Sequence, residues 1–240
     1  MPIEGMTLYA VALLLGVVML TLFLRLRVKK STPKATFFKA LTSVCFLLTW
    51  MAAAFFTRVS YFAAFVGVGL VMGLLGDIWL DLKFCCPKED EDAYTKFGFL
   101  SFGIGHVFFV LAVILGTVGG FKPIAFLPAC GVAVVAALVV FFGEKAMKLK
   151  YGAYKIISTV YGAVLFFMAA FAFFSALFSG FAANRHLIVM AVGGVFFILS
   201  DLILSGTYFG EGKNRPVDIV TNHVFYYAAQ FVIASSVLFL

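Results

Sequence analysis

Charged residues are scarce in this chain: they make up 12% of its 240 residues, whereas 64% are hydrophobic. A soluble globular domain carries about 25% charged and about 45–50% apolar residues. A chain this short cannot bury so much apolar surface inside itself, so lipid must solvate the rest. The short alternating segments of a transmembrane barrel are missing too. The long unbroken apolar runs therefore predict an all-α integral membrane protein.

Cysteine is also rare, and its four residues are Cys45, Cys85, Cys86 and Cys130. Two lie inside apolar runs and two are adjacent in a loop, which gives neither a disulfide framework nor a metal-binding spacing. No nucleophilic serine or cysteine motif is present either. We therefore expect no bound metal and no cofactor.

Eight apolar segments can be traced, each close to the roughly 20 residues that cross a bilayer. They lie near 7–24, 37–56, 61–82, 98–117, 124–142, 153–178, 187–209 and 221–239. Proline and glycine mark the breaks between them, and the connections are short. The pattern predicts one multi-pass domain, 1–240, built as a bundle of eight transmembrane helices.

The net charge of +7 is distributed unevenly over the predicted loops. Fifteen of the 18 Lys and Arg residues lie in or beside the first, third, fifth and seventh loops, and the other three are Arg58, Lys122 and Arg185. The positive-inside rule places the cation-rich loops in the cytoplasm and both termini on the non-cytoplasmic side. The charge thus indicates topology, and we expect no nucleic-acid partner.

Ionisable side chains at membrane depth are costly, and a few interrupt the apolar segments. Those that we single out are Asp77, Asp81, His106, Tyr161, Asp201, His223, Tyr227 and Gln230. Asp77 and Asp201 have no basic residue at their depth in the predicted topology, so they need a functional reason. Asp81 is near enough to a helix end to reach water, and His223 lies close to the interface, where a structural role is the simpler interpretation.

Five of these residues come from five different segments but fall at similar depths. Counted from the helix ends at 1.5 Å per residue, Asp77, His106, Tyr161, Asp201 and Tyr227 lie roughly 9–12 Å below the cytoplasmic surface. The opposite half of the bundle has almost no such groups. One polar layer of this kind predicts a shared cavity that opens to the cytoplasm or the inner leaflet.

The order of these polar motifs resembles the YhhN-like lysoplasmalogenases, a family of small eight-helix membrane proteins. The matching residues are Lys39, Gly76-Asp77 with Leu80, Phe97-Gly98 with Phe102 and His106, Tyr161 with Met168, Ser200-Asp201 with Leu204, and Tyr226-Tyr227-Ala228-Ala229-Gln230. The resemblance covers nearly the whole chain. It departs at Ala40, where proline is usual, and at Phe109, where tyrosine is common.

The resemblance implies hydrolysis of the vinyl ether bond of a lysoplasmalogen, a single-chain lysophospholipid, to a fatty aldehyde and glycerophosphoethanolamine or glycerophosphocholine. Such a reaction needs a positioned acid to protonate the β-carbon and a carboxylate to stabilise the oxocarbenium ion. We expect Asp77 and Asp201 to share these tasks, without a prediction of which is the acid. His106 and Tyr227 are candidates to orient them, while Lys39 and Lys155 are candidates to meet the lipid phosphate.

Two other classes of function fit part of the pattern. A metal-dependent lipid hydrolase could use Asp77, His106, Asp201 and His223 as mixed oxygen and nitrogen ligands. A proton-coupled transporter could use the intramembrane carboxylates as proton relays, although a transport pathway needs polar groups on both sides of the midplane. The sequence does not fix the oligomeric state or the preferred head group.

Overall fold

The computed structural model describes residues 3–29, 33–57, 60–211 and 214–240. Within these ranges only the backbone is described for Ile3 in α1 and Phe56 in α2. In the described chain, eight α-helices and four short 3₁₀ turns account for almost all regular structure. The α-helices are α1 (Ile3–Lys29), α2 (Pro33–Phe56), α3 (Tyr61–Leu82), α4 (Glu91–Gly116), α5 (Phe126–Phe142), α6 (Lys155–Ser179), α7 (Arg185–Phe209) and α8 (Pro216–Ser235). The predicted all-α architecture of eight helices is confirmed.

Seven of the eight helices are long and apolar enough to cross a membrane, counting only the described residues. The exception is α8, whose 20 residues include Asp218, Asn222, His223 and Gln230. These polar side chains lower its hydropathy. They are tolerated because Asn222 and Gln230 are buried against neighbouring helices. The protein is thus a multi-pass integral membrane protein.

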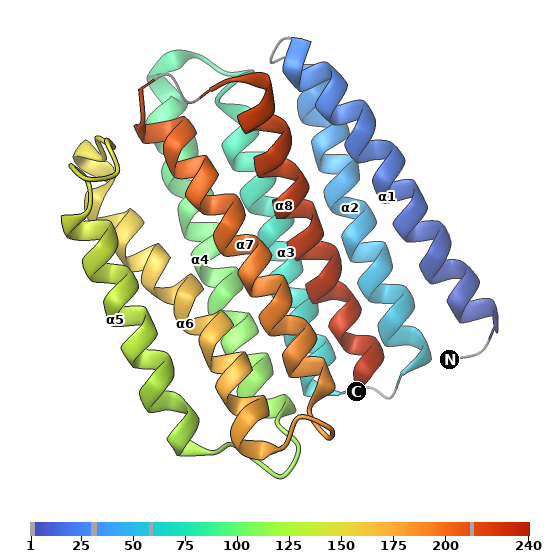
Figure 1. Cartoon of the computed structure of the whole chain (residues 1–240). Coiled ribbons are helices and arrows are strands. Elements are labelled where there is room, and N and C mark those ends of the chain that lie inside the picture. Colours follow the sequence, from blue (N-terminus) through green and yellow to red (C-terminus); the bar gives the residue numbers. More distant parts are fainter. Residues whose placement is uncertain (1–2, 30–32, 58–59, 212–213) are drawn as a thin grey trace.

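The helices run up and down side by side as a bundle (Figure 1). Sequential partners pack together as α1 with α2, α3 with α4, α5 with α6 and α7 with α8. Helix α8 also contacts α1, α2 and α3, whereas α6 contacts α4 and α7. In the figure α1 and α5 lie at opposite edges, so α8 and α3 occupy the middle of the bundle.

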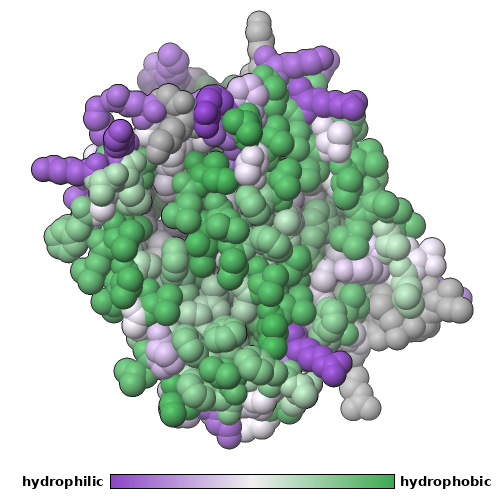
Figure 2. Space-filling model, in the orientation of Figure 1, coloured by the Kyte–Doolittle hydropathy of each residue, from purple (hydrophilic) through white to green (hydrophobic). Residues whose placement is uncertain are grey.

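The last turns of α1, α3, α5 and α7 and the first turns of α2, α4, α6 and α8 gather at one end of the bundle, which we call the cationic end (Figure 1). Hydrophilic side chains cluster at this end, and a broad hydrophobic surface lies below them (Figure 2). Among the cations behind the topology prediction, Lys30, Arg58 and Lys213 lie outside the described residues. The side of the membrane on which the cationic end and the termini lie stays a prediction.

Local sequence signals account for several helix ends. Ser60 precedes α3, and its hydroxyl accepts a hydrogen bond from the Ala63 amide at 3.1 Å, as expected of an N-cap residue. Helix α8 starts at Pro216, and the Asp218 carboxylate accepts a hydrogen bond from the Arg215 amide at 3.0 Å. Helix α4 starts seven residues before the predicted segment, because its first turns are charged and project beyond the apolar run.

Candidate active site

A cavity of about 970 Å³ opens among the helices and is lined by residues of all eight. Its size is at the upper end of the range of small-molecule sites, roughly 300–1,000 Å³. Its lining includes Asp77 from α3 and Asp201 from α7. Two carboxylates from separate helices therefore face one space.

The wall contributed by α5 is apolar and long, and apolar residues of α6 extend it. It includes Pro128, Gly131, Val135 and Val139 of α5, and Leu165 of α6. From Pro128 to Val139 the helix rises by roughly 17 Å. The cavity thus combines an elongated hydrocarbon wall with a polar wall.

Asp77 lies at the centre of the polar wall and is 2% exposed. Its Oδ2 atom accepts hydrogen bonds from the hydroxyls of Ser43 and Tyr226, each at 2.6 Å. Its Oδ1 atom lies 3.2 Å from the ammonium of Lys39. Two hydroxyl donors and one cation therefore stabilise a negative charge on this carboxylate.

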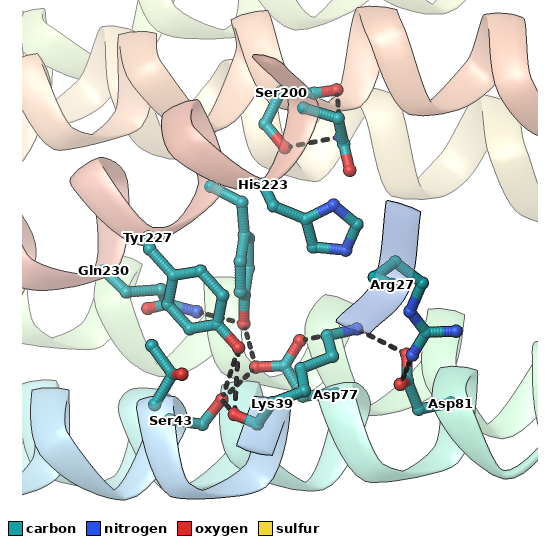
Figure 3. Close-up of polar contacts among 12 residues, drawn as sticks. Arg27, Lys39, Ser43, Asp77, Asp81, Ser200, His223, Tyr227 and Gln230 are labelled. Atoms are coloured by element: carbon teal, nitrogen blue, oxygen red, sulfur yellow. Dashed lines mark hydrogen bonds and ion pairs between the residues drawn. The ribbon is translucent and has the colours of Figure 1, made fainter. Parts of the chain in front are cut away.

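Asp81 lies one helical turn beyond Asp77 and completes an ion network (Figure 3). The Lys39 ammonium lies 3.0 Å from Asp81 Oδ1, and the Arg27 guanidinium contacts Asp81 Oδ2. The charges of two cations and two carboxylates balance within this group. Such compensation is what allows four ionisable side chains to be almost fully buried together.

A second layer of side chains holds this network in place. Gln230 Nε2 donates to the Tyr226 hydroxyl at 3.0 Å, and the Tyr227 hydroxyl donates to the Lys39 carbonyl at 3.0 Å. Gly73 makes room for Gln230: a Cβ atom at that position would lie 2.6 Å from Gln230 Nε2. Helix α8 thereby fixes both the hydroxyl that donates to Asp77 and the backbone that carries Lys39.

Asp201 has different surroundings. It is partly buried, and its Oδ2 atom accepts a hydrogen bond from the Tyr161 hydroxyl at 2.5 Å. His106 Nε2 lies 3.4 Å from the same hydroxyl. Among the residues that the structure describes, no Lys, Arg or His forms an ion pair with Asp201. Asp201 thus has a neutral donor where Asp77 has a cation.

Aromatic rings connect the two carboxylates. The ring of Tyr226, which donates to Asp77, packs edge-to-face on Phe197 with centroids 5.4 Å apart. Phe197 lies one turn before Asp201 on α7 and also packs on His106 at 4.7 Å. The rings fix the relative positions of the two acids and keep the space around them apolar.

At the cationic end, the cavity is lined by Lys83, Phe84, Glu91 and Tyr208. The Lys83 ammonium lies over the Tyr208 ring, 3.4 Å from its centroid. Burial lowers the pKa of Lys83 to about 7, although nearby Glu91 opposes the shift. Lys83 therefore carries a readily lost proton at the mouth of the cavity.

A model of the YhhN family matches residues 34–237. The chain belongs to the YhhN family. This family is associated with lysoplasmalogenase activity. No curated protein and no solved structure matches the chain.

The YhhN match spans α2 to α8, so it includes every helix of the site except α1. The structure brings most of the residues singled out in the sequence to the cavity wall, namely Lys39, Asp77, Asp81, Tyr161, Asp201 and His223. The other three lie behind the wall: His106 contacts Tyr161, Tyr227 contacts Lys39 and Ser43, and Gln230 contacts Tyr226. They position lining residues and do not line the cavity themselves.

Two expectations about this region were wrong. Asp77 does have a basic residue at its depth, because Lys39 extends along α2 and reaches it. Asp81 does not reach water, since it is 3% exposed and paired with Arg27 and Lys39. Of the two lysines considered for a lipid phosphate, Lys39 lines the cavity and is paired with Asp77 and Asp81, and Lys155 lies 3.2 Å from Glu144. Their role in binding a phosphate stays a prediction.

The four residues of the metal-hydrolase alternative do not form one cluster. Within the described ranges, no group of three or more His, Cys, Asp or Glu residues is placed to hold a metal ion. His223 Nδ1 lies 2.8 Å from the Ile219 carbonyl of its own helix, and His106 contacts Tyr161.

Three further residues of the site were not assigned to it from the sequence. Arg27 was counted as a loop cation, but it is 6% exposed and contacts Asp81. Ser43 follows Lys39 by four positions, so it shares the same helix face, and this spacing was the available signal. Ser158 is buried on the cavity wall and its hydroxyl has no hydrogen-bond partner among the described residues, so it is available to a bound molecule.

Proposed function

We propose that this protein hydrolyses the vinyl ether bond of lysoplasmalogens. The observation that supports this most directly is that two carboxylates with contrasting partners line one cavity. Membership of the YhhN family gives independent support. The elongated apolar wall of α5 and α6 suits the single hydrocarbon chain of a lysolipid.

The contrast between the carboxylates assigns their roles in this proposal. Asp77 has a cation and two hydroxyl donors, which suit the ionised form. Asp201 has one neutral donor and apolar neighbours, which suit a carboxyl group that carries a proton. Asp201 is therefore the general acid, and Asp77 is the carboxylate that stabilises positive charge and accepts a proton from water.

The reaction then proceeds in three steps. Asp201 transfers its proton to the β-carbon of the vinyl ether, so a C–H bond forms and the double-bond electrons leave an oxocarbenium ion. Water adds to the α-carbon while Asp77 accepts its proton, giving a hemiacetal. As the carbon–oxygen bond to glycerol breaks, Asp77 returns its proton to the glycerol oxygen and Asp201 accepts the proton of the hemiacetal hydroxyl. The fatty aldehyde and the glycerol hydroxyl of the head group are released, and both carboxyl groups regain their starting protonation. One water molecule is consumed, and no redox partner is needed.

The decisive experiment measures aldehyde release by purified protein from a 1-alkenyl lysophospholipid in D₂O. Because the proposed first step protonates carbon, the aldehyde, reduced at once to its alcohol, should carry one deuterium at the former β-carbon. Asp77→Asn and Asp201→Asn should each lose activity. Matched substitutions at acidic residues away from the cavity, Asp90→Asn and Asp92→Asn, should retain it.

Two results would overturn the proposal. The first is the absence of aldehyde release by folded wild-type protein. The second is full activity in either Asp77→Asn or Asp201→Asn. Transport of a small solute by reconstituted protein, without hydrolysis, would instead favour the transporter interpretation.

A further inference from the structure

We propose that the cavity mouth at the cationic end is a subsite for a zwitterionic phosphodiester head group, with Lys83 binding the phosphate and Glu91 binding the ammonium. This inference rests on the proposed lysolipid substrate. It names the part of the site that would select the head group.

The charged side chains that line the cavity are only partly matched by one another. Arg27 and Lys39 are already matched by Asp77 and Asp81. The other charged groups on the lining, apart from Asp201, are Lys83 and Glu91. Lys83 and Glu91 thus provide one positive and one negative charge at the mouth that the buried network does not use. These two charges are complementary to a head group with one phosphate and one ammonium.

The Lys83 ammonium contacts aromatic rings and not a carboxylate of the described chain. No carboxylate lies within ion-pair distance of its ammonium among the described residues. Its contacts are instead the faces of Tyr208 and Phe84, at 3.4 and 5.0 Å from the ring centroids. The rings hold the ammonium on the cavity wall and leave its hydrogen-bond donors available for an anionic oxygen.

Glu91 provides the negative charge at the same end of the cavity as Lys83. It is the first residue of α4, it is exposed, and it lines the same cavity as Lys83. Its charge acts on Lys83 without a direct ion pair between them. Lys83 and Glu91 therefore interact electrostatically but do not form an ion pair. A molecule that has both charges can insert between the two side chains.

The cavity extends from the cationic end along α5. Lys83 and Glu91 lie at the cationic end, whereas the apolar wall continues along α5 as far as Pro128. A lysolipid bound with its head at Lys83 would place its hydrocarbon chain along that wall. The ether bond between head and chain would then lie near the middle of the cavity, where Asp77 and Asp201 line it.

The test measures lipid binding and is independent of hydrolysis. Wild type and variants in detergent are titrated by calorimetry at pH 6 with 1-O-hexadecyl-glycerophosphocholine, whose alkyl ether is not a vinyl ether. The comparison ligands are 1-O-hexadecyl-glycerol-3-phosphate, which lacks the ammonium, and 1-O-hexadecylglycerol, which lacks both charges. Glycerophosphocholine and inorganic phosphate test whether the charges bind without a chain.

Lys83→Gln should weaken binding of both phosphate-containing lipids roughly tenfold and leave 1-O-hexadecylglycerol unchanged. Glu91→Gln should weaken binding of the phosphocholine lipid but not of the glycerophosphate lipid. Lys88→Gln and Glu89→Gln are the matched controls, because both residues lie on the same connection but do not line the cavity. Both controls should bind every ligand as wild type does.

Equal binding of all three lipids by wild type would overturn the inference, as would equal effects of Lys83→Gln and Lys88→Gln. Binding of glycerophosphocholine as tight as that of the lipid would also overturn it, because the site would then serve a water-soluble ligand. Head-group-dependent binding without aldehyde release would leave the subsite standing and remove the proposed reaction. Aldehyde release by wild type, with lipid binding unchanged in Lys83→Gln and Glu91→Gln, would leave the proposed reaction standing and remove the subsite.

Discussion

The ammonium of Lys39 lies 3.2 Å from Asp77 Oδ1, and both side chains are buried. The cation belongs to α2 and the carboxylate to α3, so the pair ties two neighbouring helices at the depth of the cavity. A buried ion pair of this kind contributes most visibly when one partner is removed, because the other is left without compensation.

Lys39→Met should therefore destabilise the fold. It leaves Asp77 with hydroxyl donors only, and the expected loss in the free energy of unfolding is about 3–5 kcal/mol. Denaturant-induced unfolding in detergent measures this loss. Lys34→Met is the control, because Lys34 is exposed at the start of the same helix. A Lys39→Met protein as stable as Lys34→Met would contradict the prediction. The double variant Lys39→Met/Asp77→Asn should be more stable than Lys39→Met, because the uncompensated carboxylate is removed, but it should remain inactive.

Removal of the Tyr161 hydroxyl should impair catalysis more than stability. This hydroxyl donates to Asp201 at 2.5 Å, and it orients the proposed acid toward the cavity. Loss of one such hydrogen bond corresponds to roughly a ten- to hundredfold fall in kcat, with KM little changed. Steady-state aldehyde release by Tyr161→Phe gives the measurement. Tyr154→Phe is the matched control, because its hydroxyl donates to Asp92 outside the cavity. An equal kcat in the two variants would remove Tyr161 from the proposed machinery.

The helices could be predicted from the sequence because membrane spanning depends on the length of apolar runs, which needs no knowledge of packing. The main error was at α4, where the segment Glu91–Lys96, with the charged residues Glu91, Asp92 and Lys96, continues the helix beyond the apolar run. Backbone hydrogen bonding does not require apolar side chains. Hydropathy therefore underestimates a helix that leaves the membrane.

The carboxylates of the site could also be predicted, since the cost of a carboxyl group at membrane depth is a property of one residue and its segment. Their partners could not. Lys39 and Arg27 have long side chains whose charged ends reach several ångströms along or across a helix. Whether such a side chain reaches toward the surface or toward Asp77 depends on the rotation of α1, α2 and α3 about their axes. Packing between helices fixes that rotation, and the sequence pattern of one helix does not show it.

The pKa of Lys83 gives the proposed enzyme a specific pH dependence. Burial lowers this pKa to about 7, Glu91 raises it, and the nearby cations Lys39 and Arg27 lower it. Lys83 in the free protein is thus charged below about pH 7 and loses its proton as the pH rises. With a phosphate-containing substrate, kcat/KM should fall as the pH increases from 6 to 9, because the phosphate loses its cation.

Lys83→Arg is the variant that isolates this effect, since a guanidinium stays protonated throughout the range. The ratio of kcat/KM between wild type and Lys83→Arg should therefore decrease with pH. The same ratio measured with an alkenyl glycerol that has no phosphate should stay constant. A ratio that is independent of pH for both substrates would show that Lys83 does not bind the phosphate in its protonated form.

The apolar wall predicts a limit on chain length that one residue can change. Gly131 lines the cavity on α5, and a Cβ atom added there would meet nothing within 4 Å. It lies eleven residues before the end of α5 at Phe142, roughly 17 Å from the cationic end. Gly131→Phe should fill the far part of the cavity. KM should then rise severalfold for substrates with 16 or 18 carbons and stay near the wild-type value for chains of about 10 carbons.

Gly131→Ala adds only one methyl group to open space and serves as the control. An equal rise in KM for long and short chains would mean that the hydrocarbon chain does not follow α5, whereas a shift of preference toward short chains would place its end beside Gly131.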